Sequence, residues 1–190
     1  SLFIYGGSIR PSNQNTDYVT VCEKTGEFSK GSISEEELIA VEKVSVVGPG
    51  SCGGMYTANT MASASEALGM SLPGSSSQDA VSDDKKNDCI NTGNAIENLL
   101  EKDIKPSDIM TKQAFENAIT IVIALGGSTN AVLHLIAMAH AINVDINLDD
   151  FTRIGKRVPV IADIKPFGKN YMSSLNEVGG IQPLMKMLLD

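Results

Sequence analysis

Residues that build many kinds of functional site are scarce in this sequence, which has no tryptophan, two histidines and three cysteines. Cys22, Cys52 and Cys89 show no Cys-x-x-Cys spacing, and their odd number argues against a disulfide framework. A reducing compartment is therefore expected. His134 and His140 lie six residues apart on one expected helix, hence on different faces, so they are not expected to share a metal. No complete four-ligand metal site is visible.

Basic residues and long apolar runs are also few. Lys and Arg number 15 against 23 Asp and Glu, which gives a net charge of -8 and no basic stripe. This charge excludes a general nucleic-acid or anionic-membrane surface. The longest apolar run, residues 118–125, contains Thr120 and is far too short to span a bilayer. No secretory leader opens the chain, and residues 1–5 resemble a strand already under way, so we expect a piece of a longer protein.

The remaining pattern predicts a helix-rich, incomplete α/β domain with a small, mainly parallel sheet flanked by helices. With 190 residues, 42% of them hydrophobic, the chain can bury a core. The apolar runs at residues 2–5 and 158–164 are expected strands, the second at an edge or strand start because of Pro159. Helices are expected over residues 35–44, 55–68, 89–102, 111–124, 128–141, 147–155 and 183–189. Residues 10–16 and the polar residues 73–88 are expected loops, the second a mobile surface loop.

The most informative stretch is Gly48–Met61, where Cys52 lies among glycines directly before a helix of small residues. The positive end of a helix dipole favours a thiolate, the form that binds a metal or attacks an electrophile. Glycines also let backbone amides approach a cluster sulfide or an anionic substrate closely. The alternative is a buried cysteine that fills a tight turn.

A second glycine-bounded helix start lies at Leu125–Ala131. The hydroxyl and amide groups of Ser128, Thr129 and Asn130 could hold a carboxylate or phosphate at the helix N-terminus. Ordinary N-capping explains the same residues, and no Lys follows the glycines as a Walker A loop requires. Asp163, followed by Lys165, is a further candidate on the ligand side because it ends an expected strand.

Several longer sequence motifs resemble those of the dihydroxy-acid dehydratase family, and they occur in the same order along the whole chain. They are YGGSIRP (5–11), GSCGGMYTANTM (50–61), EALGMSLPGSS (66–76), ALGGSTNAVLHL (124–135), DDF (149–151), RVPVIAD (157–163) and GGI (179–181). Related phosphogluconate and sugar-acid dehydratases carry different residues after the cysteine that corresponds to Cys52. The residues found here therefore favour the dehydratase of branched-chain amino-acid biosynthesis. The sequence of residues 43–48 differs from the sequence usual at this position in the family.

The resemblance implies loss of water from a 2,3-dihydroxy carboxylic acid, such as 2,3-dihydroxy-isovalerate or 2,3-dihydroxy-3-methylvalerate, to give a 2-keto acid for isoleucine and valine biosynthesis. It implies an iron–sulfur cluster on three cysteines, two-iron in preference to four-iron, with Mg²⁺ beside it. Cys52 matches the third cluster cysteine, whereas Cys22 and Cys89 match none. Ser128, Thr129 and Asn130 match a family motif without an assigned catalytic role. No catalytic residue is expected within this segment.

By the same resemblance, residues 1–190 are part of the N-terminal cluster-binding domain, and the C-terminal barrel domain is absent. The other cluster cysteines would lie upstream and the catalytic serine downstream, so the chain alone should be inactive. The complete enzyme is expected to be a homodimer without nucleic-acid or membrane partners. It would be cytoplasmic in a bacterium and mitochondrial or plastid in a eukaryote. The alternatives are a sugar-acid dehydratase of the same superfamily and a non-catalytic anion-binding or interaction module.

Overall fold

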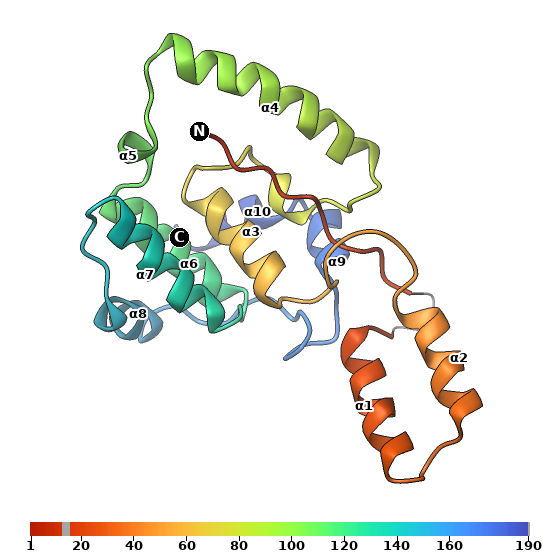
Figure 1. Ribbon diagram of the computed structural model, residues 1–190. Helices are drawn as coiled ribbons and strands as arrows, with labels where there is room; N and C mark the ends of the chain where they lie inside the picture. Colours follow the sequence, from red (N-terminus) through yellow and green to blue (C-terminus); the bar gives the residue numbers. More distant parts are fainter. Residues whose placement is uncertain (13–15, 190) are drawn as a thin grey trace.

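The protein is an assembly of helices around one apolar core, as the computed structural model shows for residues 1–12 and 16–189 (Figure 1). The helices are α1 (Tyr18–Ser29), α2 (Glu35–Ser45), α3 (Thr57–Ala67), η1 (Ser75–Ser77, a 3₁₀ turn), α4 (Asp83–Glu101), α5 (Pro106–Ile109), α6 (Lys112–Ala124), α7 (Asn130–Ala141), α8 (Leu148–Gly155), α9 (Met172–Glu177) and α10 (Ile181–Met187). Within those residues, no helix is both long and apolar enough to cross a membrane.

The expected parallel sheet is wrong, because the described residues contain isolated bridges and no strand. Residues 2–5 do not pair with another strand in the described part of the chain. The amide of Phe3 instead donates to Met70 O, in a loop, over 2.7 Å. In the segment 158–164, Ile161 N and Ala162 N both donate to Ala124 O at the end of α6. An apolar run forms a strand only when a second extended segment lies beside it over several residues. Ser8 has such neighbours, Ser51 and Asp79, but the pairing is one residue long on each side.

The core lies between α3, α6, α7 and α8. Phe115, Ile119 and Leu125 of the α6 segment are fully buried, and so are Leu135 of α7 and Ile154 of α8. Burying a side chain of this size stabilises the fold by about 1.5–3 kcal/mol. The small residues of α3 let α6 approach closely, and Figure 1 shows these two helices at the centre of the molecule. The core therefore fixes α3, whose first turn follows the cysteine loop.

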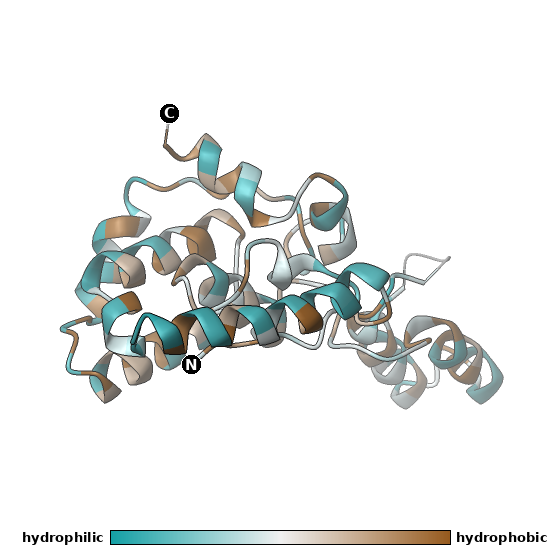
Figure 2. Ribbon diagram, turned by 90° about the horizontal axis from the view of Figure 1, so that it is seen from above, coloured by the Kyte–Doolittle hydropathy of each residue, from teal (hydrophilic) through white to brown (hydrophobic). Residues whose placement is uncertain are grey.

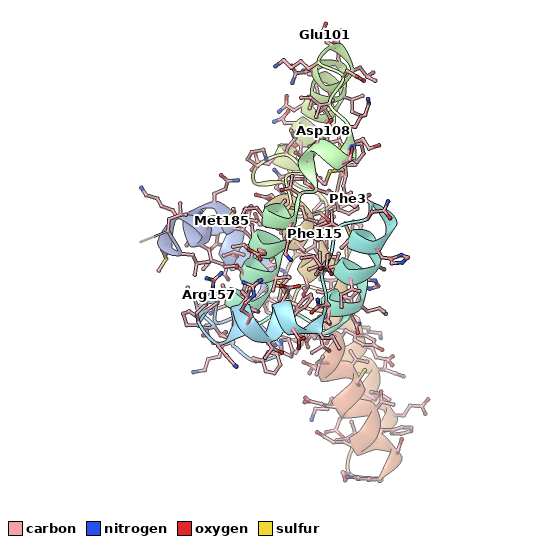
Figure 3. The ribbon with its side chains drawn as sticks, turned by 90° about the vertical axis from the view of Figure 1, so that its left-hand side faces the viewer. Phe3, Glu101, Asp108, Phe115, Arg157 and Met185 are labelled. Carbon is pink, nitrogen blue, oxygen red and sulfur yellow. The ribbon has the colours of Figure 1, made fainter. Side chains whose placement is uncertain are left out.

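Two parts extend away from this core, the hairpin of α1 and α2 and the long helix α4 (Figure 1). Helix α1 has no buried residue, and α2 has only Ser45. The hydropathy colouring of Figure 2 shows α4 as largely hydrophilic. In Figure 3 its end at Glu101 lies far from the hairpin, with Phe115 between them. Most of the burial in the chain thus belongs to the central helices.

Residues 73–88, expected as a surface loop, instead hold η1 and the first turns of α4. All three serines of η1 are buried. Helix α4 begins at Asp83, six residues before the expected start, because Ser82 caps it by accepting a hydrogen bond from Lys85 N. Its inward side there is formed by Lys85 and Asp88, both 5% exposed. A helix that buries charged residues escapes a search for apolar periodicity.

Most other helices agree with the expectation from local signals. Ser34 and Glu37 form the expected capping box at the start of α2. Thr111 caps α6, and Asn147 caps α8. Helices α1, α5 and α9 were not expected. Within the loop expected over residues 10–16, residues 13–15 lie outside the described residues.

Candidate functional site

The loop that carries Cys52 is held by backbone hydrogen bonds to segments far away in the sequence. Ser51 N donates to Gly7 O over 3.1 Å, and Ile9 N donates to Ser51 O over 2.8 Å. On its other side, Met55 N donates to Lys165 O and Met172 N donates to Gly53 O. Gly50 has a φ of +126°, and a Cβ there would lie 2.4 Å from Ile9 N. Only glycine permits this backbone and this approach.

Cys52 is exposed and forms no disulfide. The alternative of a buried cysteine that fills a tight turn is therefore wrong. The cysteine lines a small pocket of about 120 Å³ built from five short stretches of the chain. The lining residues are Ile9, Arg10, Pro11, Thr16, Asp17, Tyr18, Ser45, Val46, Gly50, Ser51, Cys52, Gly53 and Tyr171. The root of the α1–α2 hairpin thus faces the cysteine loop across this pocket.

A polar cluster on one side of the pocket includes two of its lining residues, Asp17 and Tyr171. Asp17, the N-cap of α1, accepts a hydrogen bond from Tyr56 Oη over 3.4 Å, and Lys165 Nζ lies 3.7 Å from the same Asp17 oxygen. Lys165 Nζ also donates to Tyr171 Oη over 2.8 Å. The pKa of Tyr56 is raised, first by burial and then by the Asp17 carboxylate, so this phenol stays protonated as a donor. The cluster ties α1 and the segment after residue 163 to the cysteine loop.

The opposite side of the loop rests on buried polar groups. Asn59, in the first turn of α3, donates from Nδ2 to the carbonyl oxygens of Cys52 and Gly54 over 2.7 and 2.6 Å. Tyr5 donates to Asn59 Oδ1 over 2.6 Å and is also hydrogen-bonded to Ser51 Oγ. Burial raises the pKa of the Tyr5 phenol, so it remains a donor. These contacts join residues 5, 51–54 and 59 in one network.

The second glycine-bounded helix start meets the first at α3. Ser128 N donates to Thr60 Oγ1 over 3.0 Å, and Asn130 Nδ2 donates to Thr57 Oγ1 over 2.7 Å. Thr129 and Asn130 are exposed at the start of α7, and Thr129 makes no side-chain capping bond. None of Ser128, Thr129 and Asn130 lines the pocket of Cys52. The structure therefore places these residues against the N-terminal turn of α3, beside the cysteine loop but outside its pocket.

The described residues supply one cysteine to this site. Cys22 lies on α1 and Cys89 on α4, and both are exposed and free. No group of three or more His, Cys, Asp and Glu side chains among the described residues could hold a metal ion. Of the other candidates, Lys165 belongs to the polar cluster at the pocket, whereas Asp163 accepts hydrogen bonds from the Asn170 side chain. A metal centre at Cys52 would need ligands from outside these residues.

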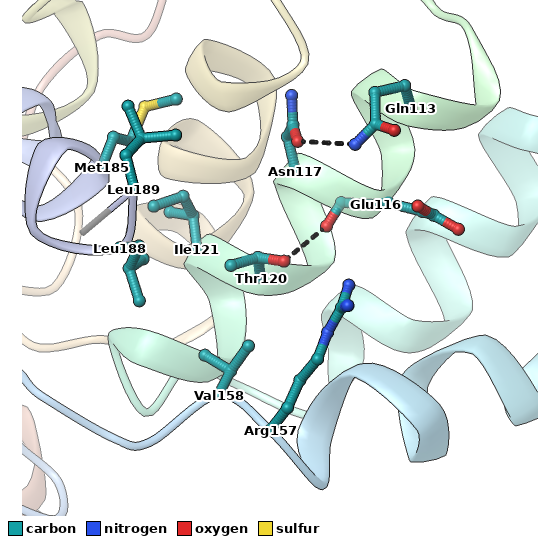
Figure 4. Close-up of a pocket in the computed structure, with 10 residues that line it drawn as sticks. All are labelled: Gln113, Glu116, Asn117, Thr120, Ile121, Arg157, Val158, Met185, Leu188 and Leu189. Carbon is teal, nitrogen blue, oxygen red and sulfur yellow. Dashed lines mark hydrogen bonds between the residues drawn. The ribbon is translucent and has the colours of Figure 1, made fainter.

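A larger pocket of about 460 Å³ lies elsewhere, between α6, α10 and the segment after α8 (Figure 4). Its polar side contains Gln113 and Asn117, hydrogen-bonded to each other over 3.2 Å, and the Arg157 side chain points toward Glu116 and Thr120. Glu116 is itself paired with Arg153 over 2.6 Å. None of the residues singled out by the sequence as chemical candidates lines this pocket. The Cys52 pocket is the better candidate site for that reason.

Sequence reasoning missed Asp17, Tyr5 and Tyr171 as members of the site. One signal was available for Asp17, because Asp17 and Thr20 form a capping box at the start of α1. Tyr5 was part of an expected strand, and Tyr171 lay in a segment without a motif. Tertiary packing alone brings these two residues to the cysteine loop.

Comparison with known proteins supports the family that the motif around Cys52 indicated. The family described as "Dihydroxy-acid/6-phosphogluconate dehydratase N-terminal" matches residues 1–190. Dihydroxy-acid dehydratases of Ruthia magnifica and Vesicomyosocius okutanii are 66% and 68% identical over 190 residues, all of this chain and 34% of each relative. That of Methylococcus capsulatus is 60% identical over 193 residues, with the same coverage. The chain thus spans about a third of the length of these curated relatives. It belongs to the dihydroxy-acid/6-phosphogluconate dehydratase family, and all of it matches the N-terminal region of that family.

Proposed function

We propose that these residues are the cluster-binding segment of a dihydroxy-acid dehydratase. The enzyme would remove water from 2,3-dihydroxy-isovalerate and 2,3-dihydroxy-3-methylvalerate to form 2-keto acids for valine and isoleucine. The single observation that carries the proposal is an exposed, unbonded Cys52 on a glycine loop at a pocket, within a chain 66–68% identical to enzymes of that name. The chain covers 34% of those relatives, so the reaction belongs to a longer polypeptide.

The residues around Cys52 fit one corner of an iron–sulfur cluster. When bound, such a cluster would supply a Lewis-acidic iron for the departing 3-hydroxyl group. The thiol is exposed, and Gly53 and Gly54 leave the loop without side chains beside it. Helix α3 begins five residues after Cys52, and its Asn59 holds the backbone carbonyl group of Cys52. The other two cysteine ligands and the magnesium ligands would come from other parts of the enzyme.

This segment's own contribution is to hold the ligand and shape one wall of the pocket. The backbone bonds to Gly7, Ile9 and Lys165 fix the loop, and Tyr171 closes one side of the pocket. Ser128, Thr129 and Asn130 remain proposed groups on the side of an anionic substrate. Their contacts with Thr57 and Thr60 also support a structural role, the joining of α7 to α3.

The finer parts of the proposal concern the complete enzyme. Residues 1–190 would belong to its N-terminal domain, followed by a barrel domain. The cluster would be of the two-iron type, and the enzyme would be a homodimer with Mg²⁺ as its second cofactor. The family to which the chain belongs supports iron–sulfur and magnesium cofactors in general terms.

A chimera tests the proposal directly. Residues 1–190 would replace the matching third of the Ruthia magnifica dehydratase, and the chimera would be loaded anaerobically with iron, sulfide and Mg²⁺. Visible absorbance of the cluster and turnover of 2,3-dihydroxy-isovalerate would be measured, with 6-phosphogluconate as the competing substrate. Cys52→Ser should abolish the absorbance and lower turnover by at least about 1,000-fold, because one of the cluster ligands is lost.

The matched controls are Cys22→Ser and Cys89→Ser, which remove the other exposed thiols. Both should keep the absorbance and stay within about twofold of the parent in turnover, because neither thiol lines the pocket. The 190-residue chain alone should bind no stable cluster. A Cys52→Ser chimera that keeps its cluster would refute the proposal, and preference for 6-phosphogluconate would move it to the other branch of the family.

A further inference from the structure

Asn59 is a buried polar residue whose hydrogen-bonding groups are all directed away from its own helix. It is 1% exposed, in the first turn of α3. An amide side chain has two N–H donors and one oxygen with two lone pairs. The two donors reach Cys52 O and Gly54 O, and the oxygen accepts from Tyr5 Oη at 2.6 Å, with Ser51 Oγ 3.4 Å away. Both donors and the acceptor of this side chain are therefore used on residues 5, 52 and 54.

The chemistry of the partners fixes the orientation of the amide. Carbonyl oxygens can only accept, so the nitrogen must face Cys52 and Gly54, and the oxygen must face the two hydroxyl groups. A helix cap would work in the opposite sense, since a capping side chain accepts from backbone amides. Asn59 donates to two carbonyl groups on either side of Gly53 instead. It thereby sets the curvature of the loop in which Cys52 lies.

Tyr5 supports this arrangement from the N-terminal segment. It is 9% exposed, and its hydroxyl group contacts both Ser51 Oγ and Asn59 Oδ1. Rotation of the Asn59 amide would turn its oxygen toward the carbonyl oxygens of Cys52 and Gly54, which can only accept. Unsatisfied buried polar groups are costly, so the network favours a single arrangement of the loop.

From this network we infer that Asn59, supported by Tyr5, is a positioning residue that holds the Cys52 loop in the shape required to bind iron. The inference rests on the proposed function, since it assumes that Cys52 is a cluster ligand. Asn59 itself contacts backbone carbonyl groups and Tyr5, and it acts on the metal only through the loop.

The test compares four variants in the same chimera, and its first measurement needs no cluster. In the apo form, hydrogen exchange would be followed at the amides of Ser51 and Met55, which bond to Gly7 O and Lys165 O. Asn59→Ala and Asn59→Asp should speed this exchange about tenfold or more, because the loop loses its two donors. In Asn59→Asp an acceptor would face two carbonyl oxygens. Tyr5→Phe, which removes one hydroxyl group, should speed exchange a few-fold. Asn94→Ala, an exposed change on α4, should leave it unchanged.

The second measurement is the iron content and visible circular dichroism of the loaded chimera. Asn59→Ala and Asn59→Asp should retain less than about a fifth of the iron, and Tyr5→Phe should alter the dichroism of a cluster that is still bound. If loop exchange rises while iron content and dichroism stay as in the parent, Asn59 is only structural and the inference fails. Unchanged exchange in all Asn59 and Tyr5 variants would also overturn it.

Cys52→Ser separates this inference from the proposed function. It keeps the backbone carbonyl that Asn59 binds, so loop exchange should match the parent while the cluster is lost. If Cys52→Ser keeps the cluster, the proposed function fails whatever Asn59 does. If Cys52→Ser loses the cluster but the Asn59 variants bind it normally, only the positioning role is wrong. Should Asn59→Ala fail to fold, Tyr5→Phe still decides the question through the same two measurements.

Discussion

Helices α6 and α4 show two different ways in which one chain attaches a helix to its core. Helix α6 has 13 residues, and its buried residues are all apolar, from Phe115 to Ala124. Helix α4 is longer, with 19 residues, yet only Lys85 and Asp88 are buried. Burial of apolar area stabilises α6 without regard to direction, whereas α4 depends on one directional contact near its start. We therefore expect stability to be spread along α6 and concentrated in the first turns of α4.

The contact that holds α4 is a buried ion pair with a serine. Lys85 Nζ lies 2.9 Å from Asp88 Oδ2 and donates to Ser75 O of η1, while Ser75 Oγ donates to the same carboxylate oxygen over 2.7 Å. The next pair on the helix, Lys86 with Asp83, is exposed to solvent. These two pairs have the same residue types and the same spacing, with the order of Lys and Asp reversed along the helix. Their main difference is burial, so the exposed pair serves as a control for the buried one.

The largest effect should come from the core of α6. Phe115→Ala removes a fully buried ring and should lower the free energy of unfolding by about 4 kcal/mol, through lost burial and a residual cavity. Leu100→Ala, at a side chain 76% exposed on α4, should cost less than about 0.5 kcal/mol. Urea denaturation of both variants measures the difference. Equal losses would mean that α4 is as much a part of the core as α6.

A smaller loss is expected when the buried pair of α4 is broken. Asp88→Ala leaves the Lys85 ammonium group buried without its counter-ion and should cost about 3 kcal/mol. Asp83→Ala breaks the exposed pair and should cost no more than about 0.5 kcal/mol. Equilibrium unfolding compares the two, and exchange of the α4 amides shows whether this helix opens first. A similar small cost for both variants would show that α4 needs no anchor.

The smallest effect concerns Asp150 in the capping box at the start of α8, and it depends on pH. The hydrogen bond from Arg153, and then that from Asn147 N, lowers the pKa of Asp150 below its ordinary value. A lowered pKa in the folded state means stability that is present above the ordinary value of about 4 and is lost as the pH falls through the lower value. Asp150→Asn should cost about 1 kcal/mol at pH 7, and this cost should shrink below about pH 4. A cost that is constant from pH 7 to pH 2 would contradict the role of the charge.

Local signals in the sequence were sufficient for much of the helical structure. The caps at Ser34, Thr111 and Asn147 act within one turn, so the sequence alone predicts where α2, α6 and α8 begin. The expected strands failed because a strand depends on a neighbour elsewhere in the chain. Residues 2–5 and 158–164 have the composition of strands but find helix ends and loops beside them.

The candidate site also combines features set by the local sequence with features set by tertiary packing. The glycines around Cys52 were compatible with either a functional thiol or a buried one that fills a turn, and the structure shows that the residue is exposed. The pocket wall could not be predicted, since Asp17 and Tyr171 reach the loop only through tertiary packing. The role of Asn59 was hidden for a related reason, because its partners are backbone carbonyl groups that carry no sequence signal.

The meeting of the two glycine-bounded motifs at one helix turn has an evolutionary consequence. Thr57 and Thr60 receive the side chain of Asn130 and the amide of Ser128, while Asn59, between them, holds the carbonyl groups beside Cys52. Replacement of Asn130 thus removes a side-chain hydrogen bond to the helix turn that supports the Cys52 loop, although the two motifs lie far apart in the sequence. We therefore expect the effects of substitutions in the two motifs to be coupled, because residues that share contacts do not act independently.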